Sequence, residues 1–429
     1  MARKRKHKPR KKTATASPGV PIELRGLFNT AVAHHQAGRV TQAEATYGHI
    51  IEQQPDHVDA LHLMGVLALQ TGRQDAAADY ITRAVALSPK VPDYQYNLGL
   101  ALAAKGELDR ATEHFRKVIE LRPDYAEAHN NLGNVLKEQG MSDEAARCYR
   151  KALELRPDYT VAHNNLGTLL FDAGNTEEAA GHYRKAIEID PADAEGHFNL
   201  GNVLKALGQP HAAIESYEKV LRVGPESADL HNNLGNALQG IGRTDEAVTH
   251  YRKAIAIDPG YAQAHNNLGL ALAKKGEPQN AAGHFRKAIE LRPDYAEAHN
   301  NLGNALREQG ILDEAVIVLR HAVALKPDSS EFHNNLGAML VESHALPQAL
   351  AEIQRALALD PDSAEAHNNL GGVRQAQGRL TEATTAFERA LVLRPDYAEA
   401  HNHLGIVLYR SGKLPEAIAA YREALALKP

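Results

Sequence analysis

Asparagine recurs at one position of a 34-residue period along most of this 429-residue chain. A carboxamide carries two N–H donors and an acceptor oxygen, so it can pair bidentately with the backbone of an extended peptide whatever side chains that peptide carries. A regular row of carboxamides would therefore suit a surface that holds extended polypeptide. The row, at position six of the period, comprises Asn29, Asn97, Asn131, Asn165, Asn199, Asn233, Asn267, Asn301, Asn335 and Asn369, and it is interrupted at Leu63 and His403.

Two nearby positions of the period add further asparagines. Asparagine is about 0.5 kcal/mol or more worse than alanine inside a helix, so this enrichment calls for a reason. At helical spacing, positions five, six and nine fall on one face, opposite the apolar stripe. Position five contributes Asn130, Asn164, Asn232, Asn266, Asn300, Asn334, Asn368 and Asn402, and position nine contributes Asn134, Asn202, Asn236 and Asn304.

The functional interpretation of this face is a groove that binds peptides. Neighbouring helices should lie about 10 Å apart, whereas an extended chain advances about 3.3 Å per residue, so each asparagine would meet roughly every third residue of the ligand. We predict binding by the nine position-six asparagines from Asn97 to Asn369, namely those of the third to the eleventh repeat. The secondary groove residues are Asn130, Asn134, Asn202, Asn236 and Asn304.

Two other interpretations of the asparagine rows remain open. The rows could bridge adjacent repeats through interhelical hydrogen bonds, or they could be a relic of duplication. Duplication is evident, since residues 114–140 and 284–310 differ at only three of 27 positions. Against duplication alone, repeats with Tyr96 or Phe198 at position five still keep asparagine at position six.

A row of histidines occupies position four. Consecutive histidines cannot bind one metal ion together. Their helices lie about 10 Å apart, whereas the bonds from a metal ion to nitrogen are about 2 Å long. We expect packed or half-buried imidazoles, and some acid sensitivity if several are buried in the neutral form. The row comprises His129, His163, His197, His231, His265, His299, His333, His367 and His401.

No catalytic, cofactor or metal site is predicted. Cys148 is the single cysteine, and with no histidine partner that recurs at matching positions it is interpreted as an incidental thiol. The chain contains no glycine-rich phosphate loop, HExxH motif or nucleophile elbow. Carboxylate pairs lie at helix starts, where the helix dipole explains them. The chain is therefore predicted to be no enzyme.

The asparagines must be positioned by a repeating pair of helices. Twelve prolines stand 34 residues apart from Pro55 to Pro429, and two apolar stripes per period, separated by a glycine, indicate a helical hairpin. Position eight is glycine in eleven repeats and position twenty is alanine in all twelve, which indicates closely packed helices. Position fifteen is glycine except at His344, so local irregularity is expected in the turn Ser343–Pro347. The predicted fold is all-α, a right-handed superhelical solenoid of twelve 34-residue hairpins with a concave groove.

These features together resemble tetratricopeptide repeats over residues 24–429, through the 34-residue length, the Leu-Gly pair at positions seven and eight, Ala at twenty and Pro at thirty-two. HNNLGNVLKEQG at 129–140 and HNNLGNALREQG at 299–310 are more narrowly similar to the repeat region of O-linked N-acetylglucosamine transferases and their bacterial relatives. That resemblance implies recruitment of protein substrates by an asparagine-lined concave surface. It gives no support for sugar transfer, because no glycosyltransferase domain follows Pro429.

The charges divide the chain into an arm and an array. Eight basic residues precede the first acid, Glu23, and without them the net charge changes from −5 to −13. Residues 1–23 are predicted to be a disordered basic arm, a candidate for contact with anionic surfaces or nucleic acid. Twelve repeats are predicted over residues 24–429, starting at positions 24, 58, 92, 126, 160, 194, 228, 262, 296, 330, 364 and 398.

The function that these observations favour is a non-enzymatic scaffold that binds extended segments of partner proteins. The alternative is the substrate-targeting part of an O-linked N-acetylglucosamine transferase-like enzyme whose catalytic domain lies elsewhere. No membrane span or signal peptide is predicted, and the chain is expected in the cytoplasm, with a composition that favours a bacterial source. The last repeat leaves Ile418, Tyr421 and Leu425 uncovered, which makes it a candidate surface for homo-oligomers.

Overall fold

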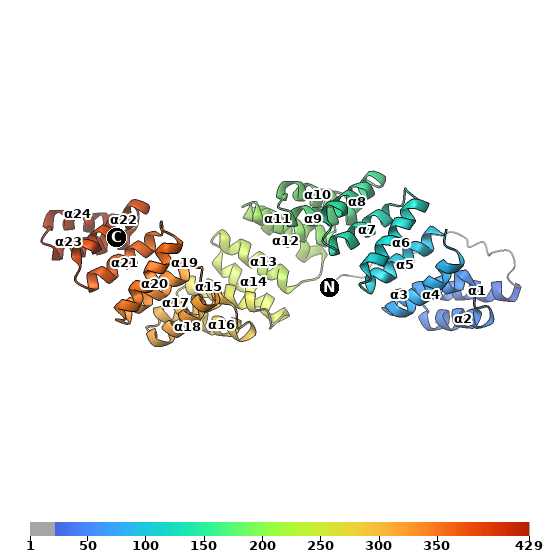
Figure 1. The fold of residues 1–429 in the computed structure, drawn as a ribbon, viewed down its shortest axis with the longest axis horizontal. Helices are drawn as coiled ribbons and strands as arrows, with labels where there is room; N and C mark the ends of the chain where they lie inside the picture. The colour runs from blue at the N-terminus through green and yellow to red at the C-terminus, as the bar shows by residue number, and fades with distance from the viewer. Residues whose placement is uncertain (1–21, 429) are drawn as a thin grey trace. The chain divides into compact units, whose positions relative to one another are not determined.

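The computed structural model describes residues 22–428, and within them the chain forms twenty-four α-helices and no strands (Figure 1). The helices alternate between a first and a second helix of successive hairpins. The first helices are α1 (Ile22–Gln36), α3 (Val58–Gln70), α5 (Pro92–Ala104), α7 (Ala126–Glu138), α9 (Thr160–Asp172), α11 (Ala194–Ala206), α13 (Ala228–Gly240), α15 (Ala262–Lys274), α17 (Ala296–Glu308), α19 (Ser330–Glu342), α21 (Ala364–Ala376) and α23 (Ala398–Arg410).

The second helices complete the hairpins and are one residue longer than most first helices. They are α2 (Val40–Gln53), α4 (Gln74–Leu87), α6 (Leu108–Leu121), α8 (Ser142–Leu155), α10 (Thr176–Ile189), α12 (Pro210–Val223), α14 (Thr244–Ile257), α16 (Pro278–Leu291), α18 (Leu312–Leu325), α20 (Leu346–Leu359), α22 (Leu380–Leu393) and α24 (Leu414–Leu427). The prediction of an all-α solenoid built from 34-residue helical hairpins is confirmed. The predicted basic arm lies almost wholly outside the described residues.

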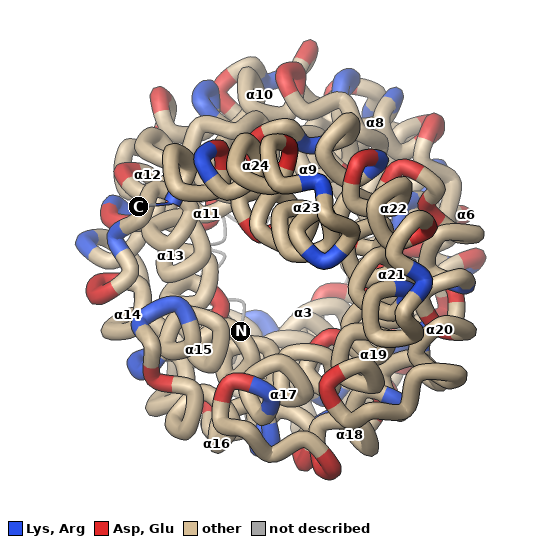
Figure 2. Tube along the Cα trace, turned by 90° about the vertical axis from the view of Figure 1, so that its left-hand side faces the viewer, with Lys and Arg blue, Asp and Glu red and all other residues tan. Residues whose placement is uncertain are grey.

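The array divides into two compact units, one up to Val203 and one from Leu204, with the boundary inside α11. Within each unit, α11 at the boundary apart, the two helices of a hairpin pack together, and each second helix packs on the next first helix. In the C-terminal unit, successive first helices from α13 to α21 also touch one another. They lie on the inner side of the curve that this unit follows, with α14, α16, α18 and α20 outside (Figure 2). The asparagine-bearing helices therefore face the inside of this curve.

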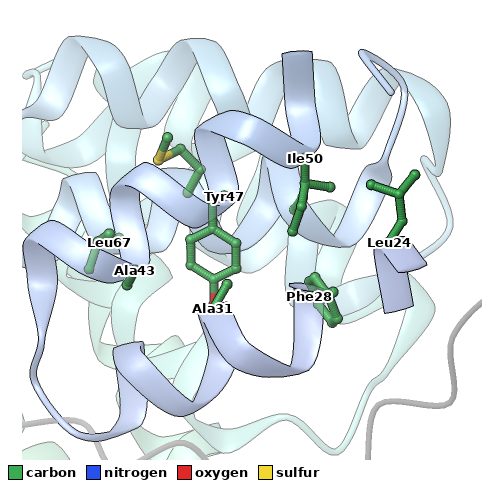
Figure 3. Packing of buried hydrophobic residues seen from close by; sticks show 9 residues of the cluster. Leu24, Phe28, Ala31, Ala43, Tyr47, Ile50 and Leu67 are labelled. Carbon is green, nitrogen blue, oxygen red and sulfur yellow. The ribbon is translucent and has the colours of Figure 1, made fainter. Parts of the chain in front are cut away.

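Each hairpin has a core of one large side chain against two small residues. In the first hairpin, Tyr47 of α2 is fully buried beside Ala31 of α1 and Ala43 of its own helix (Figure 3). In later hairpins glycine at position eight stands where Ala31 does, and the side chain at position twenty-four, which is aromatic in most of them, fills the space that a Cβ would occupy. The small residues thus allow the ring to lie between the two helix axes.

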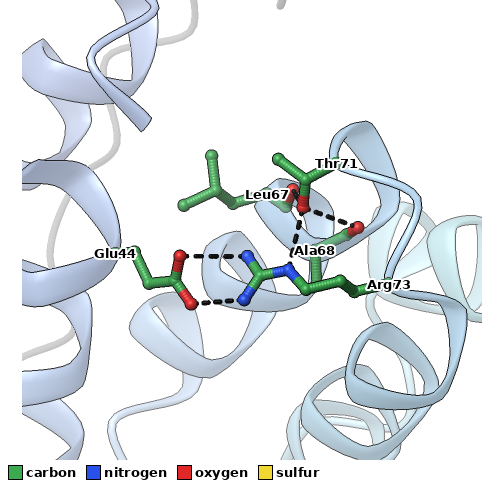
Figure 4. A network of polar contacts seen from close by, with 5 residues as sticks. All are labelled: Glu44, Leu67, Ala68, Thr71 and Arg73. Atoms are coloured by element: carbon green, nitrogen blue, oxygen red, sulfur yellow. Dashed lines mark hydrogen bonds and ion pairs between the residues drawn. The ribbon is translucent and has the colours of Figure 1, made fainter. Parts of the chain in front are cut away.

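Polar groups at the helix ends link successive hairpins. Arg73, which follows α3, forms a bidentate ion pair with Glu44 of α2, and its Nε donates to Thr71 Oγ1 at 3.0 Å (Figure 4). Thr71 Oγ1 in turn donates to the carbonyl of Leu67 at 3.0 Å. Because the Arg73 and Glu44 side chains are each more than a third exposed, we expect this pair to fix geometry more than to add stability.

Eleven hairpin turns contain a glycine with positive φ, between 70° and 81°. At Gly140 the turn is a Schellman motif, in which Gly140 N–H donates to Lys137 O and Met141 N–H donates to Leu136 O. The turn between α19 and α20 keeps the equivalent hydrogen bonds, although His344 takes the glycine position with φ 58°. The irregularity expected at Ser343–Pro347 is therefore confined to the backbone strain of one residue.

Replacing His344 by glycine is expected to raise the free energy of unfolding by about 1 kcal/mol, because a residue with a Cβ is strained in the left-handed conformation. Urea unfolding followed by circular dichroism measures the change. Gly310→Ala, at the equivalent turn after α17, is the matched control and should lower stability by a similar amount. A His344→Gly variant less stable than the parent chain would contradict the strain argument.

None of the helices within residues 22–428 has the length and the hydropathy that crossing a bilayer requires.

Candidate functional site

The position-six asparagines lie on the first helices and form one row within each unit. All nine predicted binding residues, from Asn97 to Asn369, have half-buried side chains. Asn29, in the first hairpin, is exposed. Half-burial leaves each of the nine carboxamides in contact both with the protein and with solvent.

In the C-terminal unit, the position-six asparagines from Asn267 to Asn369 each donate a hydrogen bond to position five of the preceding repeat, and these hydrogen bonds are the rungs of a ladder. Asn301 Nδ2 donates to Asn266 Oδ1 at 3.0 Å. His403, which interrupts the asparagine row, continues this ladder through a 3.0 Å contact between its Nδ1 and Asn368 Oδ1. The remaining rungs are Asn267 to Asn232 (2.9 Å), Asn335 to Asn300 (2.9 Å) and Asn369 to Asn334 (2.8 Å).

The N-terminal unit contains the same ladder with more varied partners. Asn165 Nδ2 donates to Asn130 Oδ1 at 2.9 Å, and Asn131 Nδ2 donates to the Tyr96 hydroxyl at 2.7 Å. Asn97 Nδ2 lies 2.7 Å from His62 Nε2. A position-five side chain with an acceptor atom is enough for a rung, which explains why the ladder continues where His62 or Tyr96 replaces asparagine.

One rung of the N-terminal unit is absent. Asn164 uses its Nδ2 to donate to Asp193 Oδ2 at 2.6 Å, and its Oδ1 is buried without a hydrogen-bond partner. Asn199 is the position-six residue that would donate to this oxygen. The repeat at α11 is thus a local departure from the ladder.

Position five does not share the solvent-facing surface that the sequence predicted for it. Asn130, predicted as a secondary groove residue, is only 1% exposed, and Asn164, Asn232, Asn266, Asn300, Asn334 and Asn368 are also buried. Position five is buried because it points at the neighbouring first helix, and the helical face alone does not reveal that contact. Asn130 acts as an acceptor beneath the surface.

The position-nine asparagines are half-buried and two of them are held by tyrosine. Tyr149 and Tyr251 each donate a hydroxyl proton to the Oδ1 of Asn134 and Asn236, at 2.8 Å. Asn304 has no such donor, because its hairpin carries Leu319 at position twenty-four, and it makes no hydrogen bond to the part of the chain that the structure describes. Asn202 is also half-buried.

The ladder leaves the position-six oxygens as the available polar groups. In Asn165, Asn267, Asn301, Asn335 and Asn369, Nδ2 is used in the rung, whereas Oδ1 accepts no hydrogen bond from residues 22–428. Asn165 and Asn267 use both N–H groups, since each also donates to position nine. The bidentate pairing expected from the sequence is therefore blocked at these two residues, and the interhelical alternative describes how the amide N–H groups are used.

Acidic residues at position two flank the row, and most are already partnered. Arg156 pairs with Glu127 at 2.7 Å, and Tyr261 donates to Asp229 at 2.8 Å. Further pairs join Arg122 to Asp93 (3.3 Å), Lys326 to Glu297 (3.4 Å) and Arg394 to Glu365 (2.5 Å). Four of the nine position-two acids are thus paired with a basic side chain, and hydrogen bonding is the polar interaction that the row itself offers.

The position-four histidines pack between the helices, as the sequence predicted, and three of them pair with a histidine at position twenty-three. His163 Nε2 lies 3.1 Å from the carbonyl of Pro157, which fixes its proton on Nε2 and leaves Nδ1 to accept from His182 Nδ1 at 2.9 Å. His231–His250 (2.9 Å) and His265–His284 (3.1 Å) repeat this contact. No cluster of three or more histidine, cysteine or acidic side chains suited to a metal ion occurs within residues 22–428.

The same geometry relates Cys148 to a histidine. Position twenty-three faces position four, so Cys148 is matched with His129, and both line one pocket. The sequence contained the signal, a constant spacing of nineteen residues between the histidine pairs, but the spacing gains meaning only when the two helices are seen to face each other.

Family models for tetratricopeptide repeats match residues 28–92, 101–140, 126–159 and 362–429. A model described as the C-terminal domain of cilia and flagella-associated protein 70 matches residues 158–370. A search of curated proteins found no match.

Several solved structures are similar to this chain. The APC/C hetero-tetramer Cut9–Hcn1 matches with a TM-score of 0.53 and 15% identity, over 95% of this chain and 94% of that chain, which shows a shared fold. YrrB, described as a TPR protein with an unusual peptide-binding site, matches with a TM-score of 0.38 and 27% identity over 43% of this chain and 94% of its own. MamA matches with a TM-score of 0.36 and 30% identity, over 38% of this chain and 95% of its own.

Proposed function

Because this chain belongs to the tetratricopeptide repeat family, we propose that it is a non-catalytic scaffold that holds extended segments of partner proteins along its position-six asparagines. The observation that carries the proposal is the set of Oδ1 atoms, in Asn165, Asn267, Asn301, Asn335 and Asn369, that accept no hydrogen bond from residues 22–428. The rung hydrogen bonds fix the orientation of these carboxamides, so little side-chain entropy is lost when a ligand binds.

The ligand chemistry follows from what the row lacks. Acceptors without donors call for a ligand that supplies N–H groups at regular intervals, and an extended polypeptide backbone does so. Rungs about 10 Å apart match every third residue of a chain that advances about 3.3 Å per residue. The paired acids beside the row favour backbone recognition over recognition of a particular charge.

Affinity would arise by summation along the row. A neutral hydrogen bond contributes about 1 kcal/mol net, so a single rung is weak and several rungs are needed for a stable complex. The main contacts are assigned to Asn97, Asn131, Asn165, Asn199, Asn233, Asn267, Asn301, Asn335 and Asn369. Asn134, Asn202, Asn236 and Asn304 are assigned to the edge of the same surface.

The test breaks the same two rung hydrogen bonds in two ways, once by removing the donors and once by removing the acceptors. Asn335→Ala with Asn369→Ala deletes the surface carboxamides, whereas Asn300→Ala with Asn334→Ala deletes their buried acceptors and leaves the surface oxygens. The probe is a labelled peptide selected from a random-sequence display library on the parent chain, and its affinity is measured by fluorescence polarisation. We expect the surface pair to weaken binding about 30-fold, equivalent to about 2 kcal/mol.

The buried pair serves as the matched control. It should lower the unfolding midpoint while weakening peptide binding by a few-fold at most. Equal losses of affinity in the two double variants would mean that the ladder supports the fold alone, and full affinity in the surface pair would remove the row from the binding site.

A further inference from the structure

The hairpin formed by α7 and α8 contains a pair of residues that no other repeat has. Position twenty-two is arginine only at Arg147, and position twenty-three is cysteine only at Cys148. In the hairpins of α9, α13 and α15, the residue at position twenty-three is a histidine that bonds to the position-four histidine. In the hairpin of α5, His114 Nδ1 bonds to Gln95 Oε1 at 2.6 Å. A cysteine side chain is too short to fill this place.

Cys148 lines a pocket of about 240 Å³. Its apolar floor is formed by Leu132 and Leu136, and Cys148 is half-buried at its wall. His129 also lines the pocket and is only 8% exposed. Its Nε2–H donates to the carbonyl of Pro123 at 3.1 Å, so its Nδ1 is the atom that carries a lone pair.

The Nδ1 of His129 has no hydrogen-bond partner among residues 22–428. In His163, His231 and His265, this atom contacts the histidine at position twenty-three. His129 is therefore a buried, oriented base that opens into the pocket beside the single thiol of the chain.

The rim of the pocket carries an excess of positive charge. Arg116, Arg147 and Lys151 line it against a single carboxylate, Glu144. Arg116 pairs with Glu144 at 3.4 Å and Lys151 pairs with Glu154 at 2.8 Å, whereas Arg147 has no ion-pair partner in the described part of the chain. The acidic array thus has a place next to its thiol that attracts anions.

We propose that Cys148 is a site of mixed-disulfide formation with low-molecular-weight anionic disulfides, which bind through Arg116, Arg147 and Lys151. His129 Nδ1 takes the thiol proton, and the Cys148 sulfur attacks one sulfur of the bound disulfide. The sulfur–sulfur bond of the reagent breaks as the new one forms, and the departing thiolate takes up the proton. Cys148 is oxidised to the mixed disulfide, and one half of the reagent is reduced to a free thiol.

The need for a base follows from the surroundings of the thiol. Burial raises the pKa of Cys148, and the nearby Glu144 acts in the same direction, so little thiolate forms spontaneously. Burial lowers the pKa of His129, which keeps the imidazole neutral and able to accept a proton near neutral pH. The arginines supply the attraction for the reagent, and the histidine supplies the proton transfer.

The experiment compares two aromatic disulfides of similar size with the full-length chain at low salt. The dianion dithiobis(nitrobenzoate) and neutral dithiodipyridine each release a coloured thiol, and the rates are normalised to those of free cysteine. We expect Cys148 to favour the anionic reagent about tenfold, and Arg147→Gln to reduce that preference several-fold. A preference that Arg147→Gln leaves unchanged, or no preference at all, would overturn the proposal.

A relocated thiol provides the matched control. Cys148→His combined with His182→Cys moves the only cysteine to the same position of the next hairpin, where Gly181 replaces the arginine. Because Arg150 and Lys185 stand there in place of Arg116 and Lys151, this variant should lose about as much of the anionic preference as Arg147→Gln does. His129→Gln should slow both reagents about tenfold and leave their ratio unchanged, and an unaltered rate would remove the histidine from the reaction. Circular dichroism checks folding, and mass spectrometry after exposure to glutathione disulfide identifies the mixed disulfide.

Discussion

A Gly269→Leu variant is expected to lose about 3 kcal/mol of unfolding free energy, because added volume in a packed interior forces neighbours apart. A Cβ at Gly269 would lie 2.6 Å from Cε1 of Phe285 and 2.8 Å from Cδ1, well inside contact distance. The ring is itself only 1% exposed and has no free space to move into. Urea unfolding and hydrogen exchange of α15 and α16 measure the loss.

The same hairpin provides a control variant whose expected change in stability has the opposite sign. Gly283 also lies within a helix, but a Cβ there meets nothing within 4 Å, and the position is exposed. Gly283→Leu should therefore raise stability by up to about 1 kcal/mol, since glycine is a poor helix former. If both variants changed stability alike, helix propensity rather than the fit of the Phe285 ring would govern position eight.

Acidification from pH 7.5 to pH 5 is expected to lower the unfolding midpoint through the buried histidines. Burial lowers the pKa of His62 to about 4, and burial together with the neighbouring His231 lowers the pKa of His250 to about 4, from the ordinary 6.5. Below pH 6.5 these two histidines bind protons in the unfolded chain but stay neutral in the folded chain. Their contribution to stability is therefore fully present above pH 6.5 and is lost as the pH falls toward 4. Burial also lowers the pKa of His114, His129, His163, His182, His265, His284 and His403.

Each such histidine removes about 1.4 kcal/mol per pH unit while the pH lies between its folded and unfolded pKa values. Several together would produce the largest change in stability expected for this chain. Replacing His231 and His250 by glutamine should reduce the pH dependence, and Gln95 shows that glutamine is accepted at position four. Equal urea midpoints at pH 7.5 and pH 5 would show that the imidazoles are protonated without unfolding.

Much of the fold follows from the sequence because the constraints are local and repeat. Proline after each second helix and glycine in each turn determine where helices end, and alanine at position twenty determines where they touch. His344 could be recognised as an exception, since it breaks a local rule. The conformation of the turn at His344 could not be predicted in the same way. The turn keeps its length and contains one strained residue, because the flanking helices hold it in place.

The candidate site was less predictable because it depends on contacts between repeats. Positions five and six are about 100° apart on a helix, and only the packing of neighbouring first helices decides that Asn300 is buried while Asn335 faces solvent. The role of His403 as a rung and the match of Cys148 with His129 have the same origin. Each requires knowing which position of one helix lies against which position of another.

The rungs of the ladder have a consequence for the length of the array. Every rung joins residues 35 positions apart, one repeat plus one residue. Excising residues 296–329 would place Asn335 where Asn301 stood, opposite Asn266, with donor and acceptor types unchanged. The repeats are therefore interchangeable, and the chain can gain or lose whole repeats without any change in the hydrogen bonds between neighbouring repeats. Duplications in steps of 34 residues would therefore lengthen the asparagine row and leave its chemistry intact.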